Sequence, residues 1–393
     1  MTPLARPSRR TLLVTGSLTA FAGTGMSAAR ASSGFTNPVI TTNQPDPGIL
    51  RTPEGYYLYS TAGADGNMPV LRSPDLVTWR RVGDGQPVIA AWANSGRHWA
   101  PEVIEVDGRY HAYYTAWERA TDRQSIGVAV ADSPGGPFVD DMDAPLLSTP
   151  EEGGCIDASP FRDEDGTLWL LWKNDGNAAD QDSFLFAQRM APDGLSLEGE
   201  RTCILERDQA WEIYTIEGPA VIVEGGRYYL FYSAGEYWNE TYGVGVAVAD
   251  RIEGPWTKLS DEPVLSANEV AAGPGHGMPV RTSDGIWYVY HAWRPDRIGE
   301  DPGRQTWLSK VHIDGEAVSM DAPAHQNRSG RGRSTAADRA TVPDPLSPGR
   351  GRSSRPCHSA TRSFRSPGTH LGGSDSAVHC SRPTLPSRFC ASR

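Results

Sequence analysis

The chain has 393 residues and carries 48 Asp and Glu against 37 Lys and Arg, which gives a formal net charge of −11 at pH 7. An acidic surface repels phosphate backbones, so this balance argues against nucleic acid as a partner. Between residues 32 and 323 the only cysteines are Cys155 and Cys203, too few for a disulfide framework. These two either pair or are small buried residues, and we favour the second reading.

The first 31 residues have the pattern of an export signal. Arg9-Arg10 precede an apolar stretch over residues 12–22, and Ala29-Arg30-Ala31 provides a small-residue cleavage site. The apolar stretch is far shorter than the roughly 20 residues of a membrane-spanning helix, so no transmembrane segment is expected here. The paired arginines match a bacterial twin-arginine signal, and an ordinary secretory signal is the alternative. Both predict a secreted, extracellular protein.

Residues 32–323 contain one structural unit five times. Each unit has a turn glycine followed by a run of aromatic or aliphatic residues with strand period, and these glycines are Gly55, Gly108, Gly166, Gly226 and Gly285. The first unit shows four strand candidates, over residues 48–52, 56–61, 68–73 and 78–82. Four-stranded antiparallel units repeated in this way predict an all-β, five-bladed β-propeller whose innermost strands line a central channel. A β-sandwich would also have many short strands, but it would not explain why the same unit recurs five times.

The second and fourth units agree in detail, which supports the repeat. The segments 127–132 and 245–250 both read Gly-Val-Ala-Val-Ala-Asp, 19 residues after the respective turn glycine. Each is followed by a Gly-Pro-aromatic sequence, at residues 136–138 and 254–256. We therefore expect the two blades to be built alike.

Residues 324–393 differ in character from the repeat. They hold 12 Arg and three Asp, with no Glu or Lys and only two aromatic residues. Such a segment cannot bury enough apolar surface to offset its ordering entropy, so it is predicted to be disordered. One hypothesis is an out-of-frame extension of the gene, and the other is a basic tail that docks on an anionic cell surface.

The position nine residues before each turn glycine carries the candidate chemistry. These five positions are Asp46, Trp99, Asp157, Glu217 and His276. They fall at the start of the strand nearest the propeller axis, where like charges are costly unless they have a function. Two carboxylates suffice to cleave a glycosidic bond, and a third can keep the acid protonated. Trp99 would offer a sugar-stacking face. The alternative is that these positions only shape the entry of each blade.

Five segments resemble glycoside hydrolase family 43, the propeller arabinanases, arabinofuranosidases and xylosidases, over residues 36–320. They are Gln44-Pro-Asp-Pro-Gly-Ile49, His98-Trp-Ala-Pro-Glu-Val103, Ile156-Asp-Ala-Ser-Pro-Phe161, Ile216-Glu-Gly-Pro219 and Gly275-His-Gly277. Any one of them is a weak signal, but five in order at blade spacing are specific.

The resemblance implies roles for individual residues. Asp46 would be the general base, Glu217 the general acid, and Asp157 the residue that modulates the pKa of Glu217 and orients it. Arg294 would contact sugar hydroxyls, although it could equally be a surface arginine. His276 would reach a calcium ion through water, or be purely structural. The chemistry itself would need no cofactor.

The resemblance also implies a substrate class. We expect an inverting glycosidase that cleaves α-L-arabinofuranosidic linkages in the arabinan or arabinoxylan of plant cell walls. A β-xylosidase acting on xylo-oligosaccharides is the nearest alternative. A propeller that binds carbohydrate without cleaving it, or one that serves as a scaffold for protein partners, would not need three acids in the channel.

Overall fold

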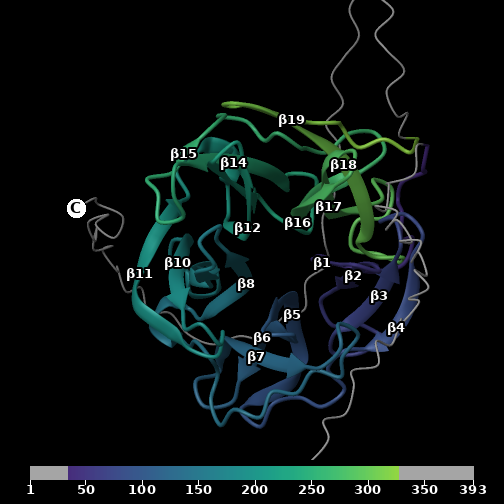
Figure 1. Ribbon diagram of the computed structural model, residues 1–393. Coiled ribbons are helices and arrows are strands. Elements are labelled where there is room, and N and C mark those ends of the chain that lie inside the picture. Colours follow the sequence, from purple (N-terminus) through teal and green to yellow (C-terminus); the bar gives the residue numbers. More distant parts are fainter. Residues whose placement is uncertain (1–33, 327–393) are drawn as a thin grey trace, which may run out of the picture. The chain divides into compact units, whose positions relative to one another are not determined.

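The computed structural model describes residues 34–326, and it arranges five antiparallel sheets around a common axis (Figure 1). The first and second sheets contain β1 (Gly48–Thr52), β2 (Gly55–Tyr59), β3 (Pro69–Ser73) and β4 (Arg80–Asp84), then β5 (Ala93–Val106), β6 (Arg109–Glu118) and β7 (Arg123–Ala131). The third contains β8 (Cys155–Arg162), β9 (Leu168–Asn174), β10 (Phe184–Met190) and β11 (Leu197–Glu206). The fourth contains β12 (Ile216–Glu224), β13 (Arg227–Ala234), β14 (Gly243–Ala249) and β15 (Thr257–Lys258). The fifth contains β16 (Ala272–Thr282), β17 (Gly285–Trp293), β18 (Gln305–Asp314) and β19 (Ala317–Met320).

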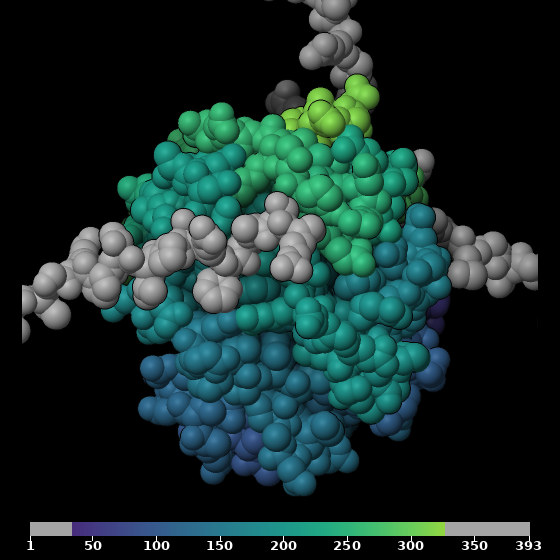
Figure 2. Space-filling model, turned by 90° about the vertical axis from the view of Figure 1, so that its left-hand side faces the viewer, coloured from purple at the N-terminus to yellow at the C-terminus, as the bar shows by residue number. Residues whose placement is uncertain are grey.

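These sheets confirm the predicted five-bladed β-propeller. Successive blades follow one another in chain order, as the colour change from blue through teal to green shows in the side view (Figure 2). Three short 3-10 helices, η1 (Pro150–Glu152), η2 (Gly176–Ala179) and η3 (Ala210–Glu212), lie in the connections. None of the helices in residues 34–326 has the length and apolar character to cross a membrane. The predicted export signal and almost all of the predicted disordered tail lie outside the described residues.

The start of the described chain closes the ring on the last blade. Ile40 forms an antiparallel bridge with Thr306 on β18. The side-chain amide of Asn37 donates to the carbonyl of Leu308 at 2.9 Å, and the N–H of Leu308 donates back to Asn37 Oδ1 at 3.0 Å. These bonds satisfy backbone groups of β18 that β19, which pairs with residues 311–314, does not reach.

The second blade departs from the prediction of four strands, because its fourth position holds only a bridge between Val130 and Val139. The equivalent β15 of the fourth blade is itself only two residues long. In both blades this outer segment follows the Gly-Pro-aromatic sequence, and proline has no N–H to donate to a ladder. The repeated motif therefore builds a minimal outer edge.

The glycine that opens each Gly-Val-Ala-Val-Ala-Asp motif makes room for a tyrosine on the neighbouring strand. Gly127 pairs with Tyr114, and Gly245 pairs with Tyr232. A Cβ at Gly245 would lie 2.4 Å from Cζ of Tyr232, so only glycine fits beneath the ring. Both tyrosine hydroxyls donate to a buried carboxylate, Asp140 in the second blade and Glu212 in the fourth.

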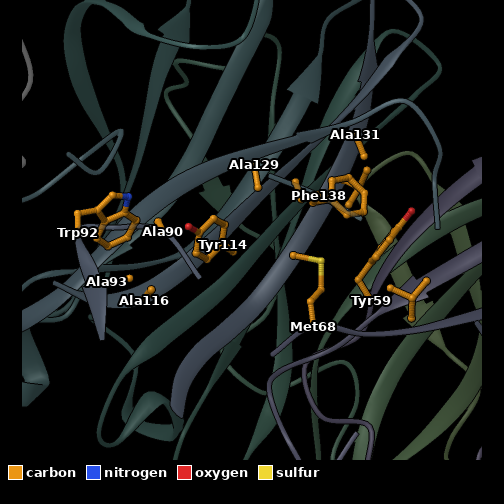
Figure 3. Close-up of a cluster of buried hydrophobic side chains, with 13 residues drawn as sticks. Tyr59, Met68, Ala90, Trp92, Ala93, Tyr114, Ala116, Ala129, Ala131 and Phe138 are labelled. Atoms are coloured by element: carbon orange, nitrogen blue, oxygen red, sulfur yellow. The ribbon is translucent and has the colours of Figure 1, made fainter. Parts of the chain in front are cut away.

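Hydrophobic clusters fill the spaces between neighbouring blades. Figure 3 shows the cluster between the first and second blades, where Tyr59 contacts Phe138 edge to face at one end and Tyr114 stacks on Trp92 at the other. Cys155 belongs to another such cluster and is a free, fully buried thiol, so it does not pair with Cys203.

Candidate active site

The inner strands of the second to fifth blades are interrupted by a β-bulge at the position that the sequence register singled out. The pairing register shifts between Trp99 and Glu102, Ile156 and Ser159, Glu217 and Ala220, and Gly275 and Met278. At or next to this position a residue takes up positive φ in every blade: Asp46, Ala100, Asp157, Gly218 and His276. Bulges of this kind re-aim side chains and often lie at active sites. The four bulged positions and Asp46, which lies just before β1, meet at one pocket.

The pocket has a volume of about 360 Å³. Its walls include all five register positions, Asp46, Trp99, Asp157, Glu217 and His276. The three carboxylates are at most 8% exposed. The sequence predicts this convergence, and the ring of five blades brings it about.

Asp46 is held as a carboxylate by donors on both of its oxygens. Arg304 Nη1 donates to Oδ1 at 2.7 Å, and the hydroxyl of Thr61 donates to Oδ2 at 2.6 Å. Nδ1 of His276 lies 3.6 Å from Oδ1. Burial alone would raise the pKa of Asp46, but the charges of Arg304 and His276 and the contact with His291 outweigh it and hold this pKa well below its usual value.

Glu217 is positioned by one hydroxyl and one ammonium group. The hydroxyl of Tyr242 donates to Oε1 at 2.7 Å, and Nζ of Lys173 lies 3.4 Å from Oε2. The Tyr242 ring also stacks on His291, whose Nδ1 accepts the backbone N–H of Asp46 at 3.2 Å. A continuous chain of buried contacts therefore joins the two carboxyl groups.

Asp157 is tied to the backbone next to Glu217. Its Oδ2 accepts the N–H of Gly218 at 2.9 Å, which fixes the strand at the residue after Glu217. Burial raises the pKa of Asp157 to about 6, the charge of Glu217 adds to this, and His276 and Lys173 oppose it. Asp157 thus keeps its proton to a higher pH than Asp46 does, although both are carboxyls of one pocket.

His276 lies among the acids rather than in a set of metal ligands. Its backbone N–H donates to the hydroxyl of Ser233 at 2.7 Å. Burial opposes protonation, but the charges of Asp157, Asp46 and Glu217 prevail and raise the pKa of His276. Residues 34–326 contain no group of three His, Cys, Asp or Glu side chains placed to hold a metal directly. A calcium ion that His276 reaches through water stays a prediction.

Arg294 lies outside the pocket, in contrast to the role that the resemblance implied. Its guanidinium is 48% exposed and pairs with Asp296 two residues away, through Nη2 at 2.9 Å. The arginine of the pocket is Arg304 instead. Its local sequence, Pro-Gly-Arg-Gln, has no strand pattern or motif that would have identified it.

Sequence reasoning also missed Lys173, which is fully buried on β9 and has three polar neighbours. Its Nζ donates to Asn177 Oδ1 at 2.6 Å and approaches both Glu217 and Asp175. Burial opposes its charge, but the neighbouring carboxylates raise the pKa of Lys173, so the ammonium persists. The only signal was a lysine that ends an otherwise apolar strand.

Glu102 is a partly buried acid on β5, three residues after Trp99. Its Oε2 accepts the hydroxyl of Ser159 at 2.9 Å. Burial raises the pKa of Glu102 to about 8.

Comparison with known proteins agrees with this geometry. The model of glycosyl hydrolases family 43 matches residues 35–317. The chain belongs to this family. A solved family 43 structure, described as a thermostable family-43 glycoside hydrolase, is 30% identical and superposes with a TM-score of 0.67. The alignment covers 76% of this chain and 98% of that family member.

Two curated relatives carry named activities. An extracellular exo-α-(1→5)-L-arabinofuranosidase of Streptomyces avermitilis is 30% identical, over 72% of this chain and 62% of its own length. A β-xylosidase of Bacillus subtilis is 27% identical, over 74% of this chain and 59% of its own length. This family 43 chain thus spans about 60% of the length of these two relatives.

Proposed function

We propose that the protein is a secreted, inverting glycoside hydrolase that cleaves α-L-arabinofuranosidic linkages in arabinan or arabinoxylan. The observation that carries this proposal is that carboxyl groups in one pocket have different hydrogen-bond donors and charges around them. Nη1 of Arg304 donates to Asp46 at 2.7 Å and keeps it ionised, whereas Glu217 accepts the neutral hydroxyl of Tyr242 at 2.7 Å, with Nζ of Lys173 farther away at 3.4 Å. Carboxyl groups with unlike environments are what acid and base roles require.

In the proposed reaction Glu217 is the general acid and Asp46 the general base. As the glycosidic bond breaks, Glu217 gives its proton to the leaving oxygen. Asp46 takes a proton from a water molecule, whose oxygen bonds to the anomeric carbon from the opposite face. The configuration therefore inverts, and proton exchange with solvent restores both groups. Asp157 orients Glu217 through its bond to the Gly218 N–H.

The preference for arabinofuranosyl groups and for secretion rests on two observations. The relative from Streptomyces avermitilis is named as an extracellular arabinofuranosidase. Residues 1–31 independently have the pattern of an export signal. A β-xylosidase is the second candidate, because the relative from Bacillus subtilis has that activity in its name.

Product analysis tests the proposal. The purified protein is incubated with linear arabinan, arabinoxylan and xylo-oligosaccharides, and proton NMR follows the first anomer released. We expect L-arabinose with inverted configuration. Release of xylose alone would favour the second candidate, and retention of configuration would contradict the role of Asp46. Binding without any product would indicate a carbohydrate-binding propeller.

A further inference from the structure

Three aromatic side chains line the pocket and are exposed to solvent. Tyr214, Tyr237 and Trp238 are 40%, 43% and 42% exposed, respectively. Their rings contact one another edge to face. The ring centroids of Tyr214 and Trp238 are 5.3 Å apart, and those of Tyr237 and Trp238 are 5.0 Å apart. We refer to these three residues as the aromatic arc. Clustered exposed apolar surface of this kind commonly marks a binding site.

Hydrogen bonds brace the loop that carries Tyr237 and Trp238. The indole N–H of Trp293 donates to the carbonyl of Tyr237 at 2.8 Å. The Thr241 N–H donates to Asn239 Oδ1 at 2.8 Å, and the N–H of Asn239 donates to the carbonyl of Glu236 at 3.0 Å, which braces the loop between β13 and β14. A preorganised aromatic surface loses little conformational entropy on binding.

The position of the aromatic arc relative to Glu217 indicates what it binds. Tyr214 comes three residues before Glu217, and Trp238 follows β13, the strand that pairs with β12 at Glu217 and Ser233. Tyr237 continues the arc to Arg304, whose guanidinium lies 5.1 Å from the centre of its ring. Tyr214 and Trp238 therefore both belong to the fourth blade, which supplies the proposed acid Glu217. A general acid must lie beside the leaving group, so these rings face the leaving-group side of the pocket.

Resting on the proposed function, we infer that Trp238 and Tyr214 form a binding site for the sugar residue that leaves, the first unit on the polysaccharide side of the cleaved bond. Its apolar C–H face would stack on the indole of Trp238. A neutral sugar suits this surface, because stacking on an aromatic ring needs no charged partner. The ligand class is a neutral oligosaccharide of at least two residues, and a single sugar would reach only the inner part of the pocket.

Binding to a catalytically silent variant tests this inference separately from the proposed function. Calorimetric titration of Glu217→Gln with α-1,5-linked arabinotriose gives the reference Kd. Adding Trp238→Ala should weaken binding about 10- to 100-fold, the usual range when an exposed aromatic anchor is truncated. Adding Trp238→Phe should keep Kd within about threefold, since a ring is retained.

Trp117 offers a matched control, because it is a partly exposed tryptophan outside the pocket that packs under Arg97. Trp117→Ala in the same background should leave Kd unchanged. An unchanged Kd for the Trp238→Ala variant, with folding verified by circular dichroism, would overturn the inference. A wild-type protein that binds arabinotriose through Trp238 but releases no sugar would overturn the proposed function and leave this inference standing.

Discussion

Nη1 of Arg304 lies 2.7 Å from Oδ1 of Asp46, although 258 residues separate the two along the chain. Asp46 immediately precedes the first blade and Arg304 precedes β18 of the last, so the contact exists only because the ring closes. Closure and the ionisation of the proposed base are thus linked by one ion pair.

Replacing Arg304 should weaken the proposed base. In Arg304→Gln the pKa of Asp46 rises, because the largest opposing charge is gone. We expect kcat/KM to fall about 10- to 100-fold and the acid limb of its pH profile to move to higher pH. Kinetics between pH 3 and 7 measure both effects. Arg294→Gln is the control, since Arg294 pairs with Asp296 outside the pocket, and it should behave as wild type.

Arg304→Gln should also lower the stability of the fold, by an amount that depends on pH. Asp46 has a folded-state pKa below its unfolded value of about 4, so its ionisation stabilises the fold above that pH and ceases to do so as pH falls through the folded-state pKa. Arg304→Gln should therefore be less stable than wild type near pH 7, and the difference should shrink in acid. Urea unfolding at pH 7 and pH 3 measures it. A constant difference would contradict the link.

Glu217 and Asp46 should respond differently to the leaving group. Glu217→Gln should lower kcat about 10²- to 10⁴-fold on a natural linkage, whose oxygen needs a proton. With a 2,4-dinitrophenyl arabinofuranoside the loss should be small, because that group leaves without protonation. Asp46→Asn should be impaired on both substrates, since both need activated water. Steady-state kinetics on the two substrates check this, and equal losses for the Glu217 variant would refute its acid role.

Lys173 should be necessary for stability at neutral pH. Lys173→Met leaves Glu217 and Asp175 without their ammonium partner in a buried site, which should reduce the free energy of unfolding by about 3–5 kcal/mol. The raised pKa of Lys173 means that its contribution is complete below pH 10 and is lost only at higher pH. Lys310→Met is the control, because the Lys310 amine donates to a backbone carbonyl at an exposed position. Denaturant unfolding compares the two variants.

Gly245→Ala should disturb the fourth blade. The new methyl group would lie 2.4 Å from Cζ of Tyr232, so the ring and its bond to Glu212 must shift, at about 1–3 kcal/mol of stability. Gly83→Ala, where no atom lies within 4 Å of the added carbon, should be neutral. Thermal unfolding of both variants measures the contrast. Equal melting temperatures would show that the blade can absorb the methyl group.

The fivefold repeat and the position of the acids within each repeat can be read from the amino-acid sequence. Turn glycines, strand-period runs and the matched motifs of the second and fourth units are local features, so they predicted five blades and placed Asp46, Asp157 and Glu217 near one axis. It also predicted that Trp99 and His276 would join them, and both line the pocket. The single disagreement in blade construction, the outer edge of the second blade, follows from a short segment after Pro137.

The groups that surround these acids become apparent only in the folded protein. Arg304, Lys173 and Tyr242 come from different blades and carry no motif, and Arg294, which had a motif-like context, lies outside the pocket. The reason is physical: the pKa of a buried carboxyl depends on charges within a few ångströms in space, whatever their separation in sequence. The sequence pattern predicts the repeat of the blades. The pKa values of the acids near the propeller axis depend on contacts that form only when the ring closes.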